Sequence, residues 1–208
     1  NEETNKRLGK KHTAKCILYS IDFEQVMVRN WENFSEVAKS FIKISKILEN
    51  AGADFIVICA NTPHKIADEI EESIGIPLLH IADATAEKIK EENLEKVGLL
   101  GTSYTMNEGF IKKRIKDKYG IEVIVPGSSD QRIIEDIIES ELSFEIIKDS
   151  SREEYKKIIE KLKSDGAQGI VLGCTEIPLL IQKDSVDIPV FDTTSIHAKV
   201  AVEFALND

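Results

Sequence analysis

Long apolar runs are missing from this sequence. No stretch approaches the 18 or more apolar residues that span a membrane, and no apolar leader stands before the first charged segment. Cysteine is scarce too, because the chain has three, an odd number without the look of a disulfide framework. We therefore expect a protein that is neither membrane-anchored nor secreted and that resides in the reducing cytoplasm.

Basic residues are also fewer than acidic ones. The 208 residues include 27 Lys and Arg against 37 Asp and Glu, a formal net charge of −10. Surfaces that bind nucleic acids or anionic membranes are rich in Lys and Arg, so we expect neither partner. A Gly-rich phosphate loop, a nucleotide fingerprint and metal-ligand spacing of the cysteines are absent as well. These absences predict a small-molecule partner, with no cofactor and no metal.

Short apolar runs alternate with longer segments of helical period. This alternation is typical of parallel strands joined by crossover helices, and it predicts an α/β fold. The expected strands are 16–21, 55–59, 78–81, 97–100, 122–125, 169–172 and 190–191. The expected helices lie near 34–50, 65–73, 84–92, 106–118, 130–142, 152–164 and 195–206.

An internal repeat indicates two similar halves. Residues 52–62 align with 166–176, and Gly, Ala, Ile and Val coincide at four positions. A second similarity follows each copy, because Ile-Pro at 76–77 corresponds to Ile-Pro at 188–189. Each copy runs from a helix end through Gly-Ala into a buried strand and then a polar cluster. Open α/β sheets place ligands at the carboxyl ends of their strands, so we expect a site there.

Cys174 is the best candidate for a reactive residue. It follows an expected strand and precedes an expected helix, where unpaired backbone N–H groups can stabilise a thiolate. A buried and inert cysteine is an equally open reading of the position alone.

The segments around Cys174 resemble the aspartate/glutamate racemase family. The resemblance rests on Leu-Gly-Cys-Thr-Glu-Ile-Pro-Leu-Leu at 172–180, Ala-Asn-Thr-Pro-His at 60–64 and Leu-Gly-Thr-Ser-Tyr-Thr-Met at 100–106, and it covers essentially the whole chain. It implies two similar doubly wound lobes with parallel sheets and an active site in the cleft between them. It also implies a homodimer.

The resemblance assigns boundaries to the two lobes. We expect the first lobe from residues 1–81 and 192–208, and the second lobe from residues 82–191. Family members usually open with a strand and a glycine-rich loop that contribute to the site. This sequence begins just after that region, so we expect the first lobe to lack its amino-terminal strand.

The activity implied is that of an isomerase, a cofactor-independent racemase or epimerase of aspartate or glutamate. Two thiols on opposite faces of Cα exchange its proton, and Cys174 corresponds to one of them. The repeat places Ala60 at the position of the other, and a methyl group cannot carry a proton, so we expect impaired activity. Cys59 is expected to face the core if strand alternation continues to it. A single-thiol decarboxylase of malonates and a catalytically silent carboxylate-binding protein remain open alternatives.

The family also implies residues that bind the substrate. Donors around the carboxylate must stabilise the carbanion left when the Cα proton departs, and a dicarboxylate needs a cation such as Lys148. A solvated surface role for Lys148 and a core role for His197 are open alternatives. The full set is Asn61, Thr62, Thr102, Thr105, Lys148, Thr175, Glu176 and His197.

Overall fold

The structure is a computed structural model that describes residues 1–27 and 33–207. Its internal contacts divide the chain into two compact units. Unit 1 comprises Asn1–Ile58, Pro63–His80 and Ala198–Asp208, and unit 2 comprises Cys59–Thr62 and Ile81–His197.

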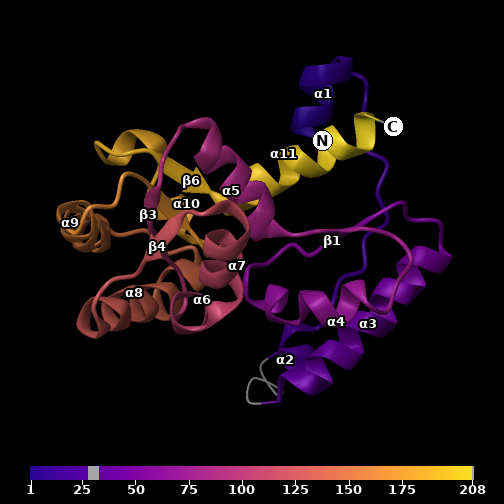
Figure 1. Ribbon diagram of the computed structural model, residues 1–208, viewed down its shortest axis with the longest axis horizontal. Coiled ribbons are helices and arrows are strands. Elements are labelled where there is room, and N and C mark those ends of the chain that lie inside the picture. The colour runs from indigo at the N-terminus through magenta and orange to yellow at the C-terminus, as the bar shows by residue number, and fades with distance from the viewer. Residues whose placement is uncertain (28–32, 208) are drawn as a thin grey trace. The chain divides into compact units, whose positions relative to one another are not determined.

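Unit 2 contains a four-stranded sheet in which every neighbouring pair is parallel (Figure 1). The strand order is β4 (Glu122–Ile124), β3 (Lys96–Leu100), β5 (Ile170–Leu172) and β6 (Val190–Asp192). One face packs against α5 (Ile81–Glu91) and α7 (Gly109–Tyr119), and the other packs against α8 (Ser128–Ser140) and α9 (Asp149–Ser164). The prediction of an α/β fold with parallel sheets is confirmed.

The central strand β5 explains why the sequence reads as a continuous apolar run there. Ile170 and Leu172 pack on the α8–α9 side, whereas Val171 packs on the α5–α7 side. Side chains alternate between the faces of a strand, and both faces of this sheet are covered by helices. All three residues are at most 1% exposed.

Unit 1 holds a two-stranded parallel sheet, which lies beside helices of the first third of the chain. Its core includes Val37, Ile56 and Ile70. Figure 1 shows α3 and α4 side by side, in agreement with their contacts. The elements are α1 (Glu2–Leu8), α2 (Phe23–Val26), α3 (Phe34–Asn50), β1 (Ile56–Val57), the 3-10 helix η2 (Thr62–Ile66) from Pro63 onward, α4 (Ala67–Glu71), β2 (Leu78–Leu79) and the later part of α11 (Thr193–Leu206).

The sequence repeat is a structural repeat within the two sheets. The N–H of Ile56 donates to the carbonyl of Pro77, and the N–H of Ile170 donates to the carbonyl of Pro189, at 2.8 Å in both cases. Each proline therefore stands at the entrance of the neighbouring strand, where its missing N–H does least harm. The two copies build the same local strand pairing.

The glycines that open each copy end a helix in the same way. Gly52 follows α3 with a φ of +90°, and Gly166 follows α9 with a φ of +94°. Glycine adopts positive φ without the steric penalty of a Cβ. Both helices therefore end at a glycine with positive φ.

Some expected elements differ from the structure. Residues 16–21 form no strand, and Leu18 within them is 81% exposed. A β-rich composition indicates a strand only where a neighbouring strand can complete its hydrogen bonds. The helix expected near 106–118 is two helices, α6 (Ser103–Asn107) and α7, because the backbone at Glu108 is extended with φ −72° and ψ 155°.

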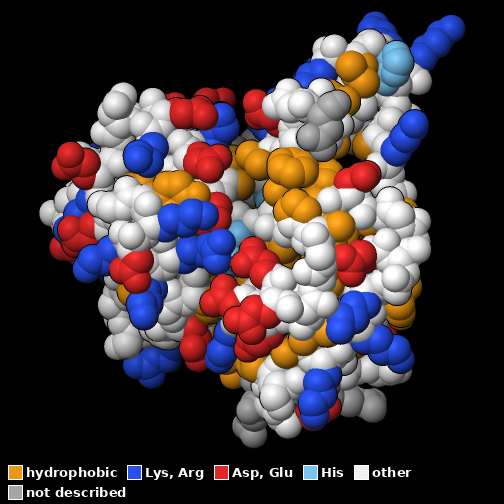
Figure 2. Space-filling model, turned by 45° about the vertical axis from the view of Figure 1, so that its right-hand side comes forward, with side chains coloured by type: hydrophobic (Ala, Val, Ile, Leu, Met, Phe, Trp, Pro, Cys, Tyr) orange, Lys and Arg blue, Asp and Glu red, His pale blue; other side chains and the backbone are white. Residues whose placement is uncertain are grey.

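Surface chemistry follows the composition. On the face shown in Figure 2, basic side chains lie among acidic ones and do not form a continuous basic surface. Across residues 1–27 and 33–207, no helix combines the length and apolarity needed to cross a membrane. Small structural elements not anticipated from the sequence are the short helices α2 (Phe23–Val26) and α10 (Ile177–Leu180) and the 3-10 helices η3 (Leu142–Phe144) and η4 (Lys183–Ser185).

Candidate active site at the carboxyl end of β5

The turn after β5 is held tightly against the end of β3. The N–H of Gly173 donates to the carbonyl of Leu100 at 2.6 Å. A Cβ on Gly173 would lie 3.0 Å from that oxygen and 2.8 Å from Cδ1 of Leu99. Only glycine permits this approach, and it fixes the start of the segment that contains Cys174.

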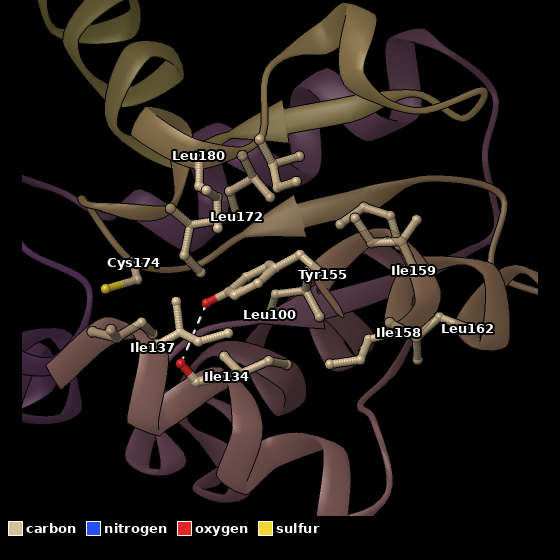
Figure 3. Close-up of a cluster of buried hydrophobic side chains, with 14 of the residues drawn as sticks. Leu100, Ile134, Ile137, Tyr155, Ile158, Ile159, Leu162, Leu172, Cys174 and Leu180 are labelled. Atoms are coloured by element: carbon tan, nitrogen blue, oxygen red, sulfur yellow. Dashed lines mark hydrogen bonds between the residues drawn. The ribbon is translucent and has the colours of Figure 1, made fainter. Parts of the chain in front are cut away.

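Cys174 lies at the margin of a buried apolar cluster. Figure 3 shows its sulfur directed away from Tyr155, whose ring packs in the same cluster with Leu100 and Leu172. The Cys174 side chain is 8% exposed, and Tyr155 is fully buried. The apolar cluster therefore bounds the residue on one side and excludes water from it there.

A carboxylate lies next to the Cys174 thiol. Sγ donates to Oε2 of Glu176 at 2.9 Å, and Oγ1 of Thr175 donates to the same oxygen at 2.7 Å. Burial raises the pKa of the Cys174 thiol to about 12, and the charge and hydrogen bond of Glu176 contribute to the rise. Backbone hydrogen bonds from Thr175 and Glu176 lower this pKa by less. The backbone hydrogen bonds expected to stabilise a thiolate are therefore present, but burial and the Glu176 carboxylate outweigh them, and the thiol keeps its proton at neutral pH.

Asn61 is tied to the end of β5 through Thr193. Oγ1 of Thr193 donates to the carbonyl of Leu172 at 2.8 Å, and Nδ2 of Asn61 donates to Oγ1 of Thr193 at 3.1 Å. A hydroxyl has one proton, so this arrangement fixes the orientation of the Asn61 amide. Its Oδ1 is buried, with no hydrogen-bond partner among the residues that the structure describes. A buried acceptor without a donor is costly, and it is suited to an N–H group of a ligand.

Thr102 and Thr105 lie beside the Gly173 turn. Thr102 accepts from the N–H of Thr105 as the N-cap of α6, and the two hydroxyl oxygens are 3.2 Å apart. A Cβ on Gly101 or on Gly173 would lie 3.0 Å from Cγ2 of Thr105. Thr105 is fully buried, whereas Thr102 is partly exposed.

The segment Cys59–Thr62 belongs by its contacts to unit 2, which also contains Cys174. Ala60 and Thr62 are partly buried. Cys59 is exposed, so the prediction that it faces the core is wrong. β1 ends at Val57 and the chain bends at Cys59 and Ala60, so strand alternation does not extend to them.

The remaining predicted residues, Lys148 and His197, lie in surroundings that differ from each other. Nζ of Lys148 forms a 3.0 Å ion pair with Glu141 on the surface, ahead of α9. His197 is 3% exposed and lies one helical turn after Thr193 on α11. Asp192 caps that helix by accepting from the N–H groups of Thr194 and Ser195.

Sequence reasoning missed Thr193 as a residue of the site. The sequence feature that could have indicated it is its position shortly after Ile-Pro at 188–189 and directly after the capping Asp192. A threonine at a helix start is usually explained by capping alone. Its role depends on the two hydrogen bonds to Asn61 and Leu172, which only coordinates reveal.

Metal ligands do not gather in the part of the chain that the structure describes, where no group of three or more His, Cys, Asp or Glu side chains could hold an ion. His64 and His80 form a buried pair in unit 1 with ring centroids 4.6 Å apart. Two imidazoles alone fall short of the four ligands of a structural zinc site.

Comparison with known sequences covers nearly the whole chain. The model of the family described as Asp/Glu/hydantoin racemase matches residues 1–201. A broad-specificity amino-acid racemase of Bacillus subtilis is 27% identical over 170 residues, which are 80% of this chain and 71% of that protein. A glutamate racemase of Streptococcus equi subsp. equi is 27% identical over 159 residues, 76% of this chain and 54% of that protein.

Solved structures show the same similarity. A candidate Asp/Glu racemase from Yersinia pestis is 46% identical with a TM-score of 0.93, and the match covers 99% of this chain and 90% of that one. An aspartate racemase homologue from Pyrococcus horikoshii is 35% identical with a TM-score of 0.84, covering 98% and 91%. Both similarities extend over both units described above.

Proposed function

The chain belongs to the Asp/Glu/hydantoin racemase family, and from this premise we propose that it is a cofactor-independent amino-acid isomerase in which Cys174 exchanges the Cα proton of an acidic amino acid. The observation that carries the proposal is the 2.9 Å hydrogen bond from the Cys174 thiol to Glu176 at the carboxyl end of β5. A thiol paired with a carboxylate can release and regain a proton without a cofactor.

The proposed exchange has two proton transfers. The Cys174 proton moves from Sγ to Oε2 of Glu176, and the resulting thiolate takes the proton from Cα of the bound amino acid. The carbanion's charge spreads into the substrate carboxylate, where hydrogen-bond donors stabilise it. Reversal of both steps returns a proton to Cα, and in heavy water it returns a deuteron.

Asn61 supports binding of an amino acid in particular. Its buried Oδ1 is an acceptor without a donor in residues 1–27 and 33–207, and an α-ammonium group supplies N–H donors. Fixed by Thr193, the amide need not reorganise when the ligand arrives. Among the relatives, one is named a broad-specificity amino-acid racemase and another an aspartate racemase homologue. We propose aspartate or glutamate as the substrate.

Isotope exchange tests this function. Each amino acid of a D/L panel, including aspartate and glutamate, is incubated with the protein in deuterated buffer, and deuterium at Cα is measured by NMR. For the enantiomer whose Cα proton faces Cys174, we expect incorporation that disappears in Cys174→Ala, because the proton carrier on that face is gone. The matched control is Cys16→Ala, an exposed cysteine in unit 1, which should exchange at the unaltered rate. Undiminished incorporation in Cys174→Ala would reject the proposal.

A second candidate reaction is favoured by Ala60 and by the protonated state of Cys174. A single thiol with a raised pKa is suited to donating a proton to one face of a carbanion, such as the one formed when a malonate loses carbon dioxide. Release of carbon dioxide from an arylmalonate, with one product enantiomer in excess and loss of both in Cys174→Ala, would support it. Calorimetric binding of aspartate without exchange or decarboxylation would instead indicate a carboxylate-binding protein.

A further inference from the structure

Racemisation needs a second proton carrier on the opposite face of Cα, and Ala60 at the repeat position of Cys174 cannot be one. Another thiol lies immediately before it. Cys59 is exposed, whereas the preceding Ile58 is buried at 6% exposure. Because the chain bends at Cys59 and Ala60, the thiol of Cys59 is outside the apolar core.

Hydrogen bonds tie the Cys59 segment to the segment of Cys174. The bonds from Asn61 to Thr193 and from Thr193 to Leu172 measure 3.1 and 2.8 Å. Cys59 stands two residues before Asn61, and Cys174 stands two residues after Leu172. Two residues span at most about 7 Å of chain. Each cysteine is therefore connected by a short piece of backbone to the hydrogen-bonded group of Asn61, Thr193 and Leu172.

The buried acceptor of Asn61 points independently to a ligand at this place. Asn61 is 5% exposed, and its Oδ1 lacks a donor within the described part of the chain. A ligand ammonium bound there is attached directly to the Cα whose proton is exchanged. The reacting carbon is then held one bond from an atom that contacts Asn61.

We propose that Cys59 is the second catalytic residue of this chain and replaces the thiol that Ala60 lacks. This inference rests on the proposed function of Cys174. In one direction, the Cys174 thiolate removes the Cα proton and becomes a thiol, while the Cys59 thiol donates its proton to the opposite face and becomes a thiolate. One C–H bond breaks and another forms, the S–H protons balance, and no oxidant or reductant takes part. The reverse direction exchanges the roles.

Paired cysteine variants test the assignment. Interconversion of D and L enantiomers is followed by chiral chromatography, and deuterium exchange of each enantiomer is followed separately by NMR. For the unaltered protein we expect interconversion together with exchange of both enantiomers. In Cys59→Ser, interconversion should fall about 100-fold or more, the usual contribution of a general acid or base. Exchange of the enantiomer whose proton faces Cys174 should remain.

Two controls keep the outcomes separate. Cys16→Ser removes the other exposed thiol and should leave both assays unaltered, and Ala60→Cys combined with Cys59→Ser should restore interconversion. The proposal is overturned if Cys59→Ser interconverts the enantiomers at the original rate, or if the unaltered protein exchanges one enantiomer only. Absence of exchange with either enantiomer would reject the function of Cys174 as well, so the two failures are distinguishable.

Discussion

At the scale of single residues, Cys174 is kept protonated by two different causes. Burial against the apolar cluster of Leu100 and Tyr155 disfavours a negative sulfur, and the Glu176 carboxylate adds a like charge beside it. The effect of burial on the pKa is the larger one, and it depends on the packing of the whole cluster. The effect of Glu176 depends on one side chain, so a substitution can remove it without altering the core.

Glu176→Gln should therefore lower the pKa of Cys174 while leaving it above its ordinary value of 9.0, because burial remains. We expect a downward shift of about one pH unit, the usual scale for a neighbouring charge. Reaction of the thiol with iodoacetamide as a function of pH measures it in a background with Cys16→Ser and Cys59→Ser. Glu135→Gln, which alters a carboxylate bonded to Ser103, is the control. An unshifted profile would contradict the role assigned to Glu176.

At the scale of elements, the geometry of the site depends on the close approach of the turns after β3 and β5. Gly173 makes it possible, since any side chain there would meet the Leu100 carbonyl and the Leu99 methyl group. The turn then places Cys174 and Thr175 just after the carboxyl end of β5. Displacement of this turn would move the thiol relative to Asn61.

Gly173→Ala should destabilise the protein by about 1 to 3 kcal/mol, the typical cost of overpacking, and should slow isotope exchange at Cα. Urea unfolding measures the free-energy change. Gly109→Ala is a matched substitution, because a Cβ at the start of α7 meets only Lys113 at 3.7 Å. We expect it to change stability by no more than about 1 kcal/mol. Equal effects of both substitutions would refute the steric argument.

Much of the element pattern could be predicted from the sequence because it depends on local periodicity. The helix over Phe34–Asn50 has the predicted bounds, and six of the seven expected strands coincide with β1 to β6. Residues 16–21 could not be assigned correctly, because their strand-like composition says nothing about a pairing partner. The site shows the same limit. Cys174 and Asn61 are visible as motifs, whereas the bonds made by Thr193 join positions far apart in the chain.

At the scale of the whole molecule, the buried thiol links stability to pH. The Cys174 pKa is about 12 in the folded chain against an ordinary 9.0. Between these values an unfolded chain has lost the proton that the folded chain retains. Stability therefore decreases as pH rises from about 9 to about 12, and the thiol's contribution is fully present below pH 9. Burial of Tyr155 raises its pKa as well and adds a decrease of the same sign above pH 10.

Cys174→Ala should reduce this alkaline loss of stability. One proton corresponds to a slope of at most about 1.4 kcal/mol per pH unit, so the variant's curve should be flatter by up to that amount between pH 9 and 12. Urea unfolding at a series of pH values gives both curves, and Cys16→Ala provides the control with an exposed thiol. Parallel curves for the unaltered protein and Cys174→Ala would show that the thiol is not buried as described.

The bond between Asn61 and Thr193 closes a loop between residues 132 positions apart. Contacts of such high sequence separation form late, because the chain must first lose the entropy of the intervening loop. A nascent polypeptide emerging from the ribosome cannot assemble this arrangement until Thr193 has been synthesised and released from the exit tunnel. Translation products that stop before Thr193 thus contain Cys174 without the partner that orients Asn61.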